Sequence, residues 1–408
     1  MKQRDVAIIG GGFAGLMAAI VCAKNGKKAS VFLYGSGSFP LNSGLIDLLG
    51  YDEARAWVKD PLAAIEQLPA EHPYHRIGKE SIEEAADFFL KLMEEEGFPY
   101  CGSLHEQQSA VTPVGTLKPS CLVPASMQAP DFAGKDVIVV GVKGLKDCYP
   151  EMIAANLADT LKEASSIRTF EVMPEAVAER DLSILDAARW LEGDGATTVS
   201  RQLAAEDGAN RVFIFPQILG VRGQRVCKKL QAAMKGKILE TTAMPPSANG
   251  MRLRDVLMKA ARRMGVEFFE NARVTGFSAD GKRCLSIRVT GVHEKDYRAE
   301  KFILATGGFY SAGLISENPG EAYEPIFDLP VACEKDPEKW TAADIFDTQP
   351  FMKAGVRTDE MLRPVDEKGA LVFENVHVIG RELAGCDFCR EHSGNGVALA
   401  SAYKAAQA

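Results

Sequence analysis

The 408-residue sequence has no excess of positive charge, no disulfide-type cysteine framework, no internal repeat and no low-complexity tract. Its formal net charge of −8 argues against nucleic acid as the main partner, because such binding depends on neutralising phosphates. Nine dispersed cysteines indicate a reducing compartment, and we expect the cytoplasm. With 46% hydrophobic and 25% charged residues, the composition is typical of a globular protein and excludes a disordered chain. The length predicts two or three domains.

The sequence also lacks a long apolar run of the kind that crosses a membrane, although one stretch resembles it. Residues 6–23 contain no charge and follow Lys2 and Arg4, which would suit a signal peptide or a short span. Asp5 and three consecutive glycines fit a strand, a turn and a helix better. We therefore expect a soluble chain that contacts the membrane only peripherally or through a partner.

The beginning of the chain carries the clearest functional signal. An apolar strand is expected over residues 5–9, a G-x-G-x-x-G motif follows at Gly10, Gly12 and Gly15, and an apolar helix extends to about Cys22. In this context the first glycine permits a tight turn, the second lets the backbone approach a pyrophosphate, and the third allows close helix–strand packing. The helix N-terminus directs N–H groups at the phosphates. The motif predicts a dinucleotide or a flavin nucleotide, and the alternative is an ordinary glycine-rich turn.

The second expected strand, residues 29–34, lacks one usual feature. In nucleotide-binding folds of this kind its end supplies an Asp or Glu that binds the adenosine ribose. That place falls near Leu33, and the sequence has no acid nearby and no arginine that would suggest a phosphorylated ribose. How the adenosine end of a nucleotide would be held is therefore open.

The middle of the chain alternates helices and strands. We expect helices over residues 52–58 and 81–96, the second with a capping box at Ser81 and Glu84. Residues 136–240 are expected to form a separate unit, with strands at 137–140, 167–172, 212–215 and 238–240 and helices at 150–164 and 182–191. This alternation implies a parallel sheet covered on both faces.

The last third of the chain is expected to complete the nucleotide-binding unit. Its predicted elements are a helix at 253–264, a strand at 266–269, a hairpin over 274–290, extended segments at 301–304 and 376–380, and a final helix from about Gly396. We predict an α/β protein with a Rossmann-type flavin-binding domain built from both chain ends and an inserted α/β cap domain. The predicted boundaries are residues 1–70, 241–310 and 365–408 for the first and residues 71–240 and 311–364 for the second.

Three glycine-rich turns follow predicted strands, at residues 10–15, 305–308 and 380–396. In two-domain flavoproteins such turns converge on the cofactor, at the pyrophosphate, beside the nucleotide and at the isoalloxazine. N–H groups at the start of the final helix would stabilise negative charge on a reduced flavin. The predicted cofactor contacts are Gly10, Gly12, Phe13, Ala14, Gly15, Ser43, Gly44, Thr306, Gly307, Gly380, Ser393, Gly394, Asn395, Gly396 and Val397.

Several segments over nearly the whole length are not generic to flavoproteins; they are His72-Pro73-Tyr74, 111–117, 141–145, 245–247, 250–253, Glu324-Pro325-Ile326, 355–360 and 362–364. In these segments the chain resembles the B subunit of anaerobic glycerol-3-phosphate dehydrogenase. The resemblance implies oxidation of sn-glycerol 3-phosphate to dihydroxyacetone phosphate. Electrons would pass to a quinone through a catalytic A subunit and an iron–sulfur, membrane-associated C subunit. It also implies FMN, whereas the G-x-G-x-x-G geometry favours FAD; we predict FAD, with FMN as the alternative.

The implied reaction transfers a hydride to flavin N5 while a base removes the substrate's hydroxyl proton. His392, just before the glycine-rich helix start, is the predicted base, and the alternative is a histidine that packs or caps there. Arg252 and Arg363 are predicted in the catalytic site, because a guanidinium binds phosphate oxygens in pairs. Arg357 and Lys118 are further substrate candidates. Each of these cations is alternatively a surface or ion-pair residue.

Cys386 and Cys389 form a C-x-x-C motif near the presumed flavin. Such a pair is found in redox dithiols and as half of a metal site. Because the sequence has no second C-x-x-C, we expect two ordinary thiols, no metal in this chain, and any iron–sulfur relay in a partner protein. His72 is expected in a turn.

Two other functions are compatible with these patterns. In the first, the chain is a non-catalytic subunit of the same complex that carries electrons or acts as a scaffold. In the second, it is another FAD-dependent oxidoreductase, of the fumarate-reductase-like or the amine-oxidising type. The three-turn architecture supports many chemistries, so the fold by itself does not choose among them.

Overall fold

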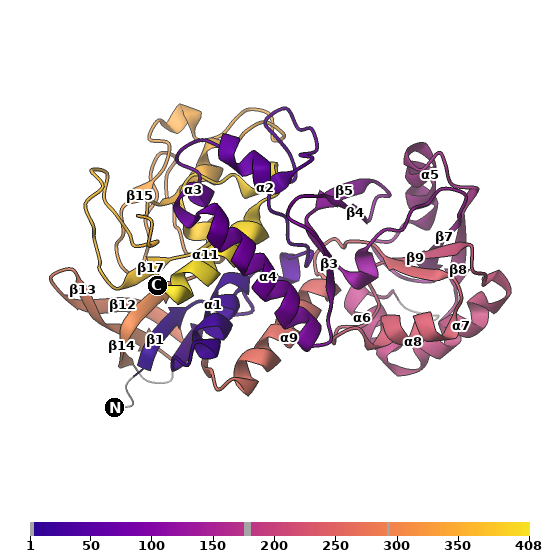
Figure 1. The fold of residues 1–408 in the computed structure, drawn as a ribbon, viewed down its shortest axis with the longest axis horizontal. Coiled ribbons are helices and arrows are strands. Elements are labelled where there is room, and N and C mark those ends of the chain that lie inside the picture. The colour runs from indigo at the N-terminus through magenta and orange to yellow at the C-terminus, as the bar shows by residue number, and fades with distance from the viewer. Residues whose placement is uncertain (1–3, 175–180, 292–293) are drawn as a thin grey trace.

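The computed structural model describes residues 4–174, 181–291 and 294–408. The chain forms two lobes, each built on its own sheet (Figure 1). The larger sheet has seven strands in the order β11-β2-β1-β14-β13-β12, with β17 paired to β14, and the smaller lobe has four in the order β10-β9-β7-β8. The predicted α/β class with parallel sheets is confirmed.

The parallel part of the larger sheet is assembled from distant parts of the chain. It contains β1 (Arg4–Ile9), β2 (Ala29–Leu33), β11 (Glu267–Glu270), β14 (Lys295–Leu304) and β17 (Val376–Val378). β1 lies between β2 and β14, and β17 adds to the far side of β14. β12 (Arg273–Asp280) and β13 (Arg283–Thr290) extend β14 as antiparallel strands. The carboxyl ends of β1, β14 and β17 therefore meet at one edge.

Helix α1 (Phe13–Lys24) explains the membrane-like composition of the N-terminus. It packs between α9 (Ala248–Arg263) and α11 (Gly394–Gln407), and its residues from Phe13 to Cys22 are all buried. A helix that is apolar on every side needs such a fully enclosed place. Among the residues described, none of the helices is both long and apolar enough to span a bilayer.

Residues 73–95 pack with the larger lobe. They form α3 (Pro73–Ile77) and α4 (Lys79–Glu95), which contact α11, and Phe89 lies in the same hydrophobic core as α1. Phe327 and Val356, from the other segment predicted for the cap, belong to this core as well. We therefore propose that residues 73–95 and 311–364, which were predicted in the cap, belong to the larger lobe. An amphipathic helix such as α4 shows in its sequence that one face is buried, but not which core it covers.

The smaller lobe contains the predicted parallel sheet. Its strands are β7 (Asp136–Val142), β8 (Ser166–Val172), β9 (Arg211–Phe215) and β10 (Lys237–Glu240), and its helices are α5 (Pro150–Thr160), α6 (Ile184–Trp190), α7 (Ala196–Leu203) and α8 (Arg225–Ala233). Separate apolar clusters lie on the two sheet faces, one containing Ile138 and Phe213 and the other Val139 and Val212. The expected cover on both faces is confirmed, although α7 and α8 had not been predicted.

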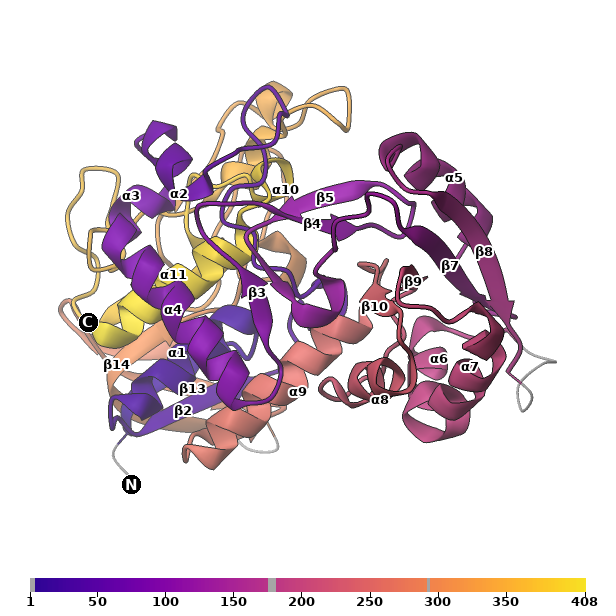
Figure 2. The ribbon, with the colours of Figure 1, turned by 45° about the vertical axis from the view of Figure 1, so that its right-hand side comes forward.

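Short elements connect the lobes and complete the larger one. They are α2 (Pro61–Ala64), β3 (Tyr100–Gly102), β4 (Gln108–Val111), β5 (Leu117–Ser120), β6 (Leu122–Pro124), β15 (Val331–Ala332), β16 (Gly355–Val356) and α10 (Phe388–Glu391). Figure 2 shows the β4–β5 hairpin extending from the larger lobe toward the smaller one. At its tip, the Val114 carbonyl accepts a hydrogen bond from Asn156 on α5 (2.6 Å).

Two local predictions are wrong. Residues 52–58 form a turn instead of a helix, because the Asp52 carboxylate accepts a hydrogen bond from the Ala56 N–H (2.9 Å) and closes it. Helix α4 begins at Lys79 after Gly78, whose φ is +83°, so Ser81 lies inside the helix and forms no capping box.

Candidate active site

The first glycine turn has the geometry of a pyrophosphate cradle. Gly10 has φ +114°, and a Cβ added there would overlap the Ala305 carbonyl. A Cβ added at Gly15 would overlap the Gly10 carbonyl, so these two glycines are required for packing. A Cβ at Gly12 would meet no heavy atom within 4 Å, so this glycine faces open space. The first turn of α1 carries no acidic residue, and its N–H groups suit an anion.

The other two predicted glycine turns meet the first. Ala305 lies against Gly10, and a Cβ added at Gly380 (φ +72°) would lie 3.1 Å from Cβ of Ala14. This convergence follows from the strand order, since the turns come after β1, β14 and β17, which are neighbours in the sheet. The predicted grouping of these residues is therefore present, and their contact with a cofactor stays a prediction.

A buried acid, which sequence reasoning missed, fixes the second turn. The Glu382 carboxylate accepts hydrogen bonds from the N–H (3.1 Å) and the hydroxyl (2.7 Å) of Thr306. Burial, together with the nearby Glu324 carboxylate, holds the pKa of Glu382 well above its usual range. The only feature of the sequence that could have indicated a role for Glu382 is its position two residues after Gly380, in the third glycine turn.

The start of α11 has no side-chain cap. The Ser393 hydroxyl, which could have capped this helix, instead donates to Glu391 (2.9 Å). The Asn395 amide donates to the Leu45 carbonyl (2.6 Å) and exchanges hydrogen bonds of 3.0 Å with the Asn42 amide. These contacts fix the first turn of α11 against the 42–45 loop. The Gly396 N–H donates to the Asp47 carbonyl (3.0 Å), which leaves the N–H groups of Gly394 and Asn395 to stabilise negative charge.

The same loop carries the predicted cofactor residues Ser43 and Gly44. The Ser43 carbonyl accepts a hydrogen bond from the Asn249 amide (2.9 Å), and the Gly44 carbonyl accepts one from the Tyr100 hydroxyl (2.7 Å). Gly44 has φ +80°, and a Cβ there would clash with the Asn249 side chain. The loop is thus held between the start of α9, the start of α11 and β3.

His392 lies at the end of this arrangement, next to Ser393. Its ring packs edge-to-face on Tyr51, with centroids 4.8 Å apart. Burial and the positive charge of Lys118 lower its pKa to about 4, and the Asp47 charge only partly offsets them. Lys118 forms an ion pair of 2.5 Å with Asp47. The structure therefore brings Lys118 together with His392, and the imidazole is neutral at neutral pH.

Three of the buried polar atoms without partners belong to His392 and to segments that lie next to it; the Gly50 N–H donates to the His392 carbonyl (3.2 Å). Asp47 Oδ1, Gln107 Oε1 and His392 Nδ1 are buried, and none of them finds a hydrogen-bond partner within the described ranges. The Gln107 amide is fixed by donating to the Leu49 carbonyl (2.8 Å). We call Asp47, Tyr51, Gln107, Lys118 and His392 the His392 cluster. Buried polar atoms are rarely left unpaired in folded proteins, so these three atoms are candidates for hydrogen bonds to a polar ligand.

The predicted arginines lie outside the His392 cluster. Arg252 is completely buried and donates to Glu240 (2.7 Å), while two further guanidinium nitrogens, Nε and Nη1, find no partner in the part of the chain that the structure describes. Arg363 is paired with Asp359 (2.7 Å), and Arg357 is exposed. The ion pairs of Arg252 and Arg363 match the alternative interpretation, in which these arginines pair with acids of the protein. A substrate role for the three arginines stays a prediction.

Cys386 lies with His72 and Glu391, whose potential ligand atoms are all within 4.8 Å of one another. His72 Nδ1 accepts the Tyr74 N–H (3.2 Å), so the ring proton is on Nε2, which donates to Glu391 (3.1 Å). Because Nδ1 of His72 accepts a hydrogen bond and Nε2 carries the proton, neither ring nitrogen has a free lone pair for a metal ion. His72 instead orients Glu391, which accepts the hydrogen bond from the Ser393 hydroxyl. Burial raises the pKa of both Cys386 and Cys389, which favours ordinary thiols over a reactive dithiol.

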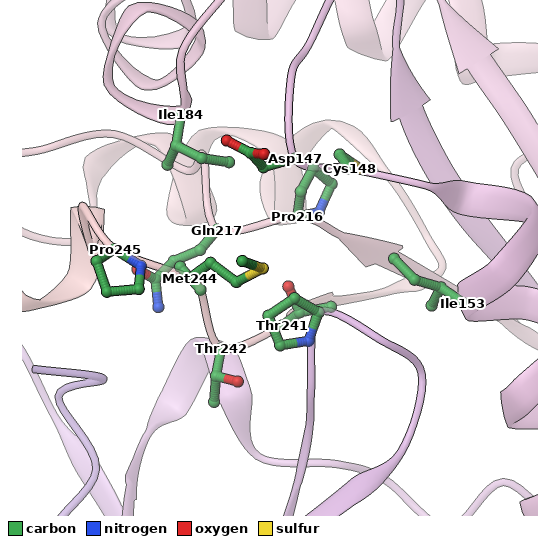
Figure 3. Close-up of a pocket in the computed structure, with 12 residues that line it drawn as sticks. Asp147, Cys148, Ile153, Ile184, Pro216, Gln217, Thr241, Thr242, Met244 and Pro245 are labelled. Carbon is green, nitrogen blue, oxygen red and sulfur yellow. The ribbon is translucent and has the colours of Figure 1, made fainter. Parts of the chain in front are cut away.

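A small cavity lies at the carboxyl ends of β7, β9 and β10 (Figure 3). Its volume of about 10 Å³ admits about one water molecule, too little for a substrate. Gln217 in its wall accepts hydrogen bonds from the Ser247 hydroxyl (2.8 Å) and the Asn249 N–H (2.9 Å). Through Asn249 this residue connects the cap sheet with the Ser43 loop, so the lobes share one polar network.

We expect His377 and His392 to contribute a loss of unfolding free energy as the pH decreases from about 6.5 to about 4, opposite in sign to the contribution of the buried Glu382 carboxyl. Burial lowers the pKa of His377 and of His392 to about 4 from the ordinary value of 6.5. Between these values the unfolded chain binds protons that the folded chain does not, so acid favours unfolding, and above about 6.5 the effect is absent. Urea unfolding at about pH 7.5, 6 and 5 measures the slope.

A single substitution tests this assignment. His377→Asn keeps an amide donor for the Met361 carbonyl, which His377 Nδ1 contacts at 2.8 Å, but removes the titrating ring. Relative to the wild type, the variant should lose less unfolding free energy as the pH decreases from about 6.5 to about 4. An identical pH dependence in the two proteins would show that His377 does not contribute.

Known proteins similar to this chain were found by sequence. Residues 5–397 match the model of a family described as FAD binding domain. The B subunit of a probable anaerobic glycerol-3-phosphate dehydrogenase from Halobacterium salinarum is 31% identical, over 100% of this chain and 97% of the relative. The B subunits of the anaerobic glycerol-3-phosphate dehydrogenases from Yersinia enterocolitica (30% identical, 98% and 96% covered) and Vibrio cholerae (31%, 100% and 96%) are similarly close.

Proposed function

This chain belongs to the FAD binding domain family and to the family of anaerobic glycerol-3-phosphate dehydrogenase B subunits, and we propose that it oxidises sn-glycerol 3-phosphate to dihydroxyacetone phosphate. The predicted family resemblance is confirmed, and so is FAD as the cofactor. The chain is a flavin-dependent oxidoreductase subunit. Two features of this chain fit FAD: the open space at Gly12 would accept its pyrophosphate, and the uncapped start of α11 would face its flavin.

The single observation that carries the proposed reaction is the set of unpartnered atoms in the His392 cluster. FAD, when bound, supplies the acceptor for the hydride that leaves the substrate carbon. Neutral His392 takes the proton of the same carbon's hydroxyl on Nδ1. The one remaining hydroxyl of the substrate donates its hydrogen to Asp47 Oδ1 or to Gln107 Oε1. Lys118 donates one of its three hydrogens to Asp47 and keeps two for phosphate oxygens.

We further propose that the electrons pass to a quinone through two partner proteins, a catalytic A subunit and an iron–sulfur C subunit, at the cytoplasmic face of the membrane. The similarity to proteins named as B subunits supports a complex. The same names favour one second candidate, in which this chain carries electrons and a partner binds the substrate.

Anaerobic mixing of the purified, FAD-loaded chain with sn-glycerol 3-phosphate tests the proposal. We expect the oxidised flavin band to bleach, whereas glycerol, which lacks the phosphate, should leave it unchanged. A band that stays oxidised until a partner protein is added would favour the relay candidate. Bleaching only by an unrelated donor would indicate a different FAD-dependent oxidoreductase, including the fumarate-reductase-like type.

A further inference from the structure

The strand order fixes the side of the crevice on which the adenosine half of FAD must lie. Dinucleotides bind across the carboxyl ends of such a sheet, with the pyrophosphate at the turn after the first strand. The flavin-side residues follow β14 and β17 and begin α11, all on one side of β1. The adenosine half therefore extends to the other side, over the ends of β2 and β11.

No free carboxylate stands at that end of the described sheet. β2 ends at Leu33, and Glu270, opposite it on β11, is paired with Arg262 (2.7 Å). The usual hydrogen bond from a ribose hydroxyl to an acid at the end of the second strand is therefore missing. The adenosine must be recognised by other groups.

An exposed aromatic ring occupies the place of the missing acid. Tyr34 directly follows β2 and is 68% exposed, although it is a large aromatic residue. Its loop reaches the pyrophosphate turn, since a Cβ added at Gly37 would lie 3.0 Å from Cα of Gly12. The guanidinium of Arg273, at the start of β12, lies 6.0 Å from the centre of the ring. The sequence shows no arginine near residue 33, but the fold brings this one there.

We propose that Tyr34 and Arg273 form a platform on which the adenine of FAD stacks, in place of the ribose–carboxylate hydrogen bond. An aromatic ring binds a purine through its flat face without reading its hydrogen-bonding groups. Arg273 adds a positive charge beside the stacked rings. This inference concerns the cofactor alone and does not depend on which substrate is oxidised.

Titration of flavin-free protein with FAD and with FMN, followed by flavin fluorescence, tests the platform. FMN contains the flavin and one phosphate but no adenosine, so it serves as the internal control. Tyr34→Ala should raise the Kd for FAD about tenfold and leave the Kd for FMN unchanged. Tyr34→Phe, which keeps the ring, should bind both as the wild type does. Arg273→Gln should raise the Kd for FAD alone by about threefold.

Three outcomes would overturn the platform. The first is a wild type that binds FAD no more tightly than FMN. The second is a Tyr34→Ala variant that binds FAD with the wild-type Kd. The third is a Tyr34→Ala variant whose Kd values for FAD and for FMN rise by the same factor. Because the Tyr34 side chain is outside the core, its removal should leave thermal unfolding unchanged, and that measurement verifies that each variant is folded. Failure of substrate to bleach the flavin would refute the proposed reaction and leave this result untouched.

Discussion

Gly12→Val is expected to give a folded protein that is purified without its FAD. A Cβ at this position meets no heavy atom within 4 Å, and the φ of −76° suits any residue, so we expect the backbone to accept a side chain here. The branched side chain would fill the space in which the pyrophosphate approaches the N–H groups of α1. Loss of these charge-assisted hydrogen bonds should weaken FAD binding on the order of a hundredfold. The ratio of flavin to protein absorbance, measured with the thermal unfolding curve, checks both parts.

Gly15→Val is the matched comparison. It also should lose FAD, but for another reason, because its Cβ would overlap the Gly10 carbonyl and separate α1 from β1. We expect this variant to unfold at a lower temperature than flavin-free wild-type protein or to be insoluble, whereas Gly12→Val should unfold at the temperature of the flavin-free wild type. Full FAD occupancy in folded Gly12→Val protein would contradict the placement of the pyrophosphate.

The parts of this fold that sequence predicted well are those with a local physical signature. The β1–turn–α1 unit was placed correctly because glycine spacing and an unbroken apolar run determine it within about twenty residues. The cap strands were found for the same reason, since buried parallel strands are short and continuously apolar. The amphipathic helix α8 was missed; its fully buried side chains are Val226 and Leu230, and Cys227 packs partly against the same core.

The site was only partly accessible from sequence, because its decisive contacts join distant segments. Lys118 was a candidate, but its partner Asp47 is 71 positions away, and neither the ion pair nor the neutral state of His392 follows from local pattern. Arg252 illustrates the opposite case. Its glycine-rich surroundings suggested a ligand contact, whereas the fold buries it against Glu240. Charge pairing in a core is a property of the tertiary structure.

His392→Asn is expected to slow reduction of the flavin by sn-glycerol 3-phosphate by about a hundredfold to ten-thousandfold, the usual contribution of a positioned base. His392 has φ +50°, and asparagine tolerates this left-handed conformation, so the variant should keep its backbone while losing the proton acceptor. His392→Ala removes the acceptor as well, with added backbone strain. Anaerobic stopped-flow at the flavin band gives the rate, and FAD titration should show an unchanged Kd.

The pH dependence separates a base from a packing residue. A pKa of about 4 keeps His392 neutral from about pH 8 down to about 5, so acidification over this range should not slow the wild type through this group. His75→Asn is the matched control, because His75 is exposed and, among the described residues, its ring hydrogen-bonds to the Leu68 carbonyl alone (2.9 Å). Its rate should equal that of the wild type. If His392→Asn also reduced its flavin at the wild-type rate, a group other than His392 would accept the substrate's proton. The unpartnered oxygens of Asp47 and Gln107 would then indicate substrate binding without a role for His392 in catalysis.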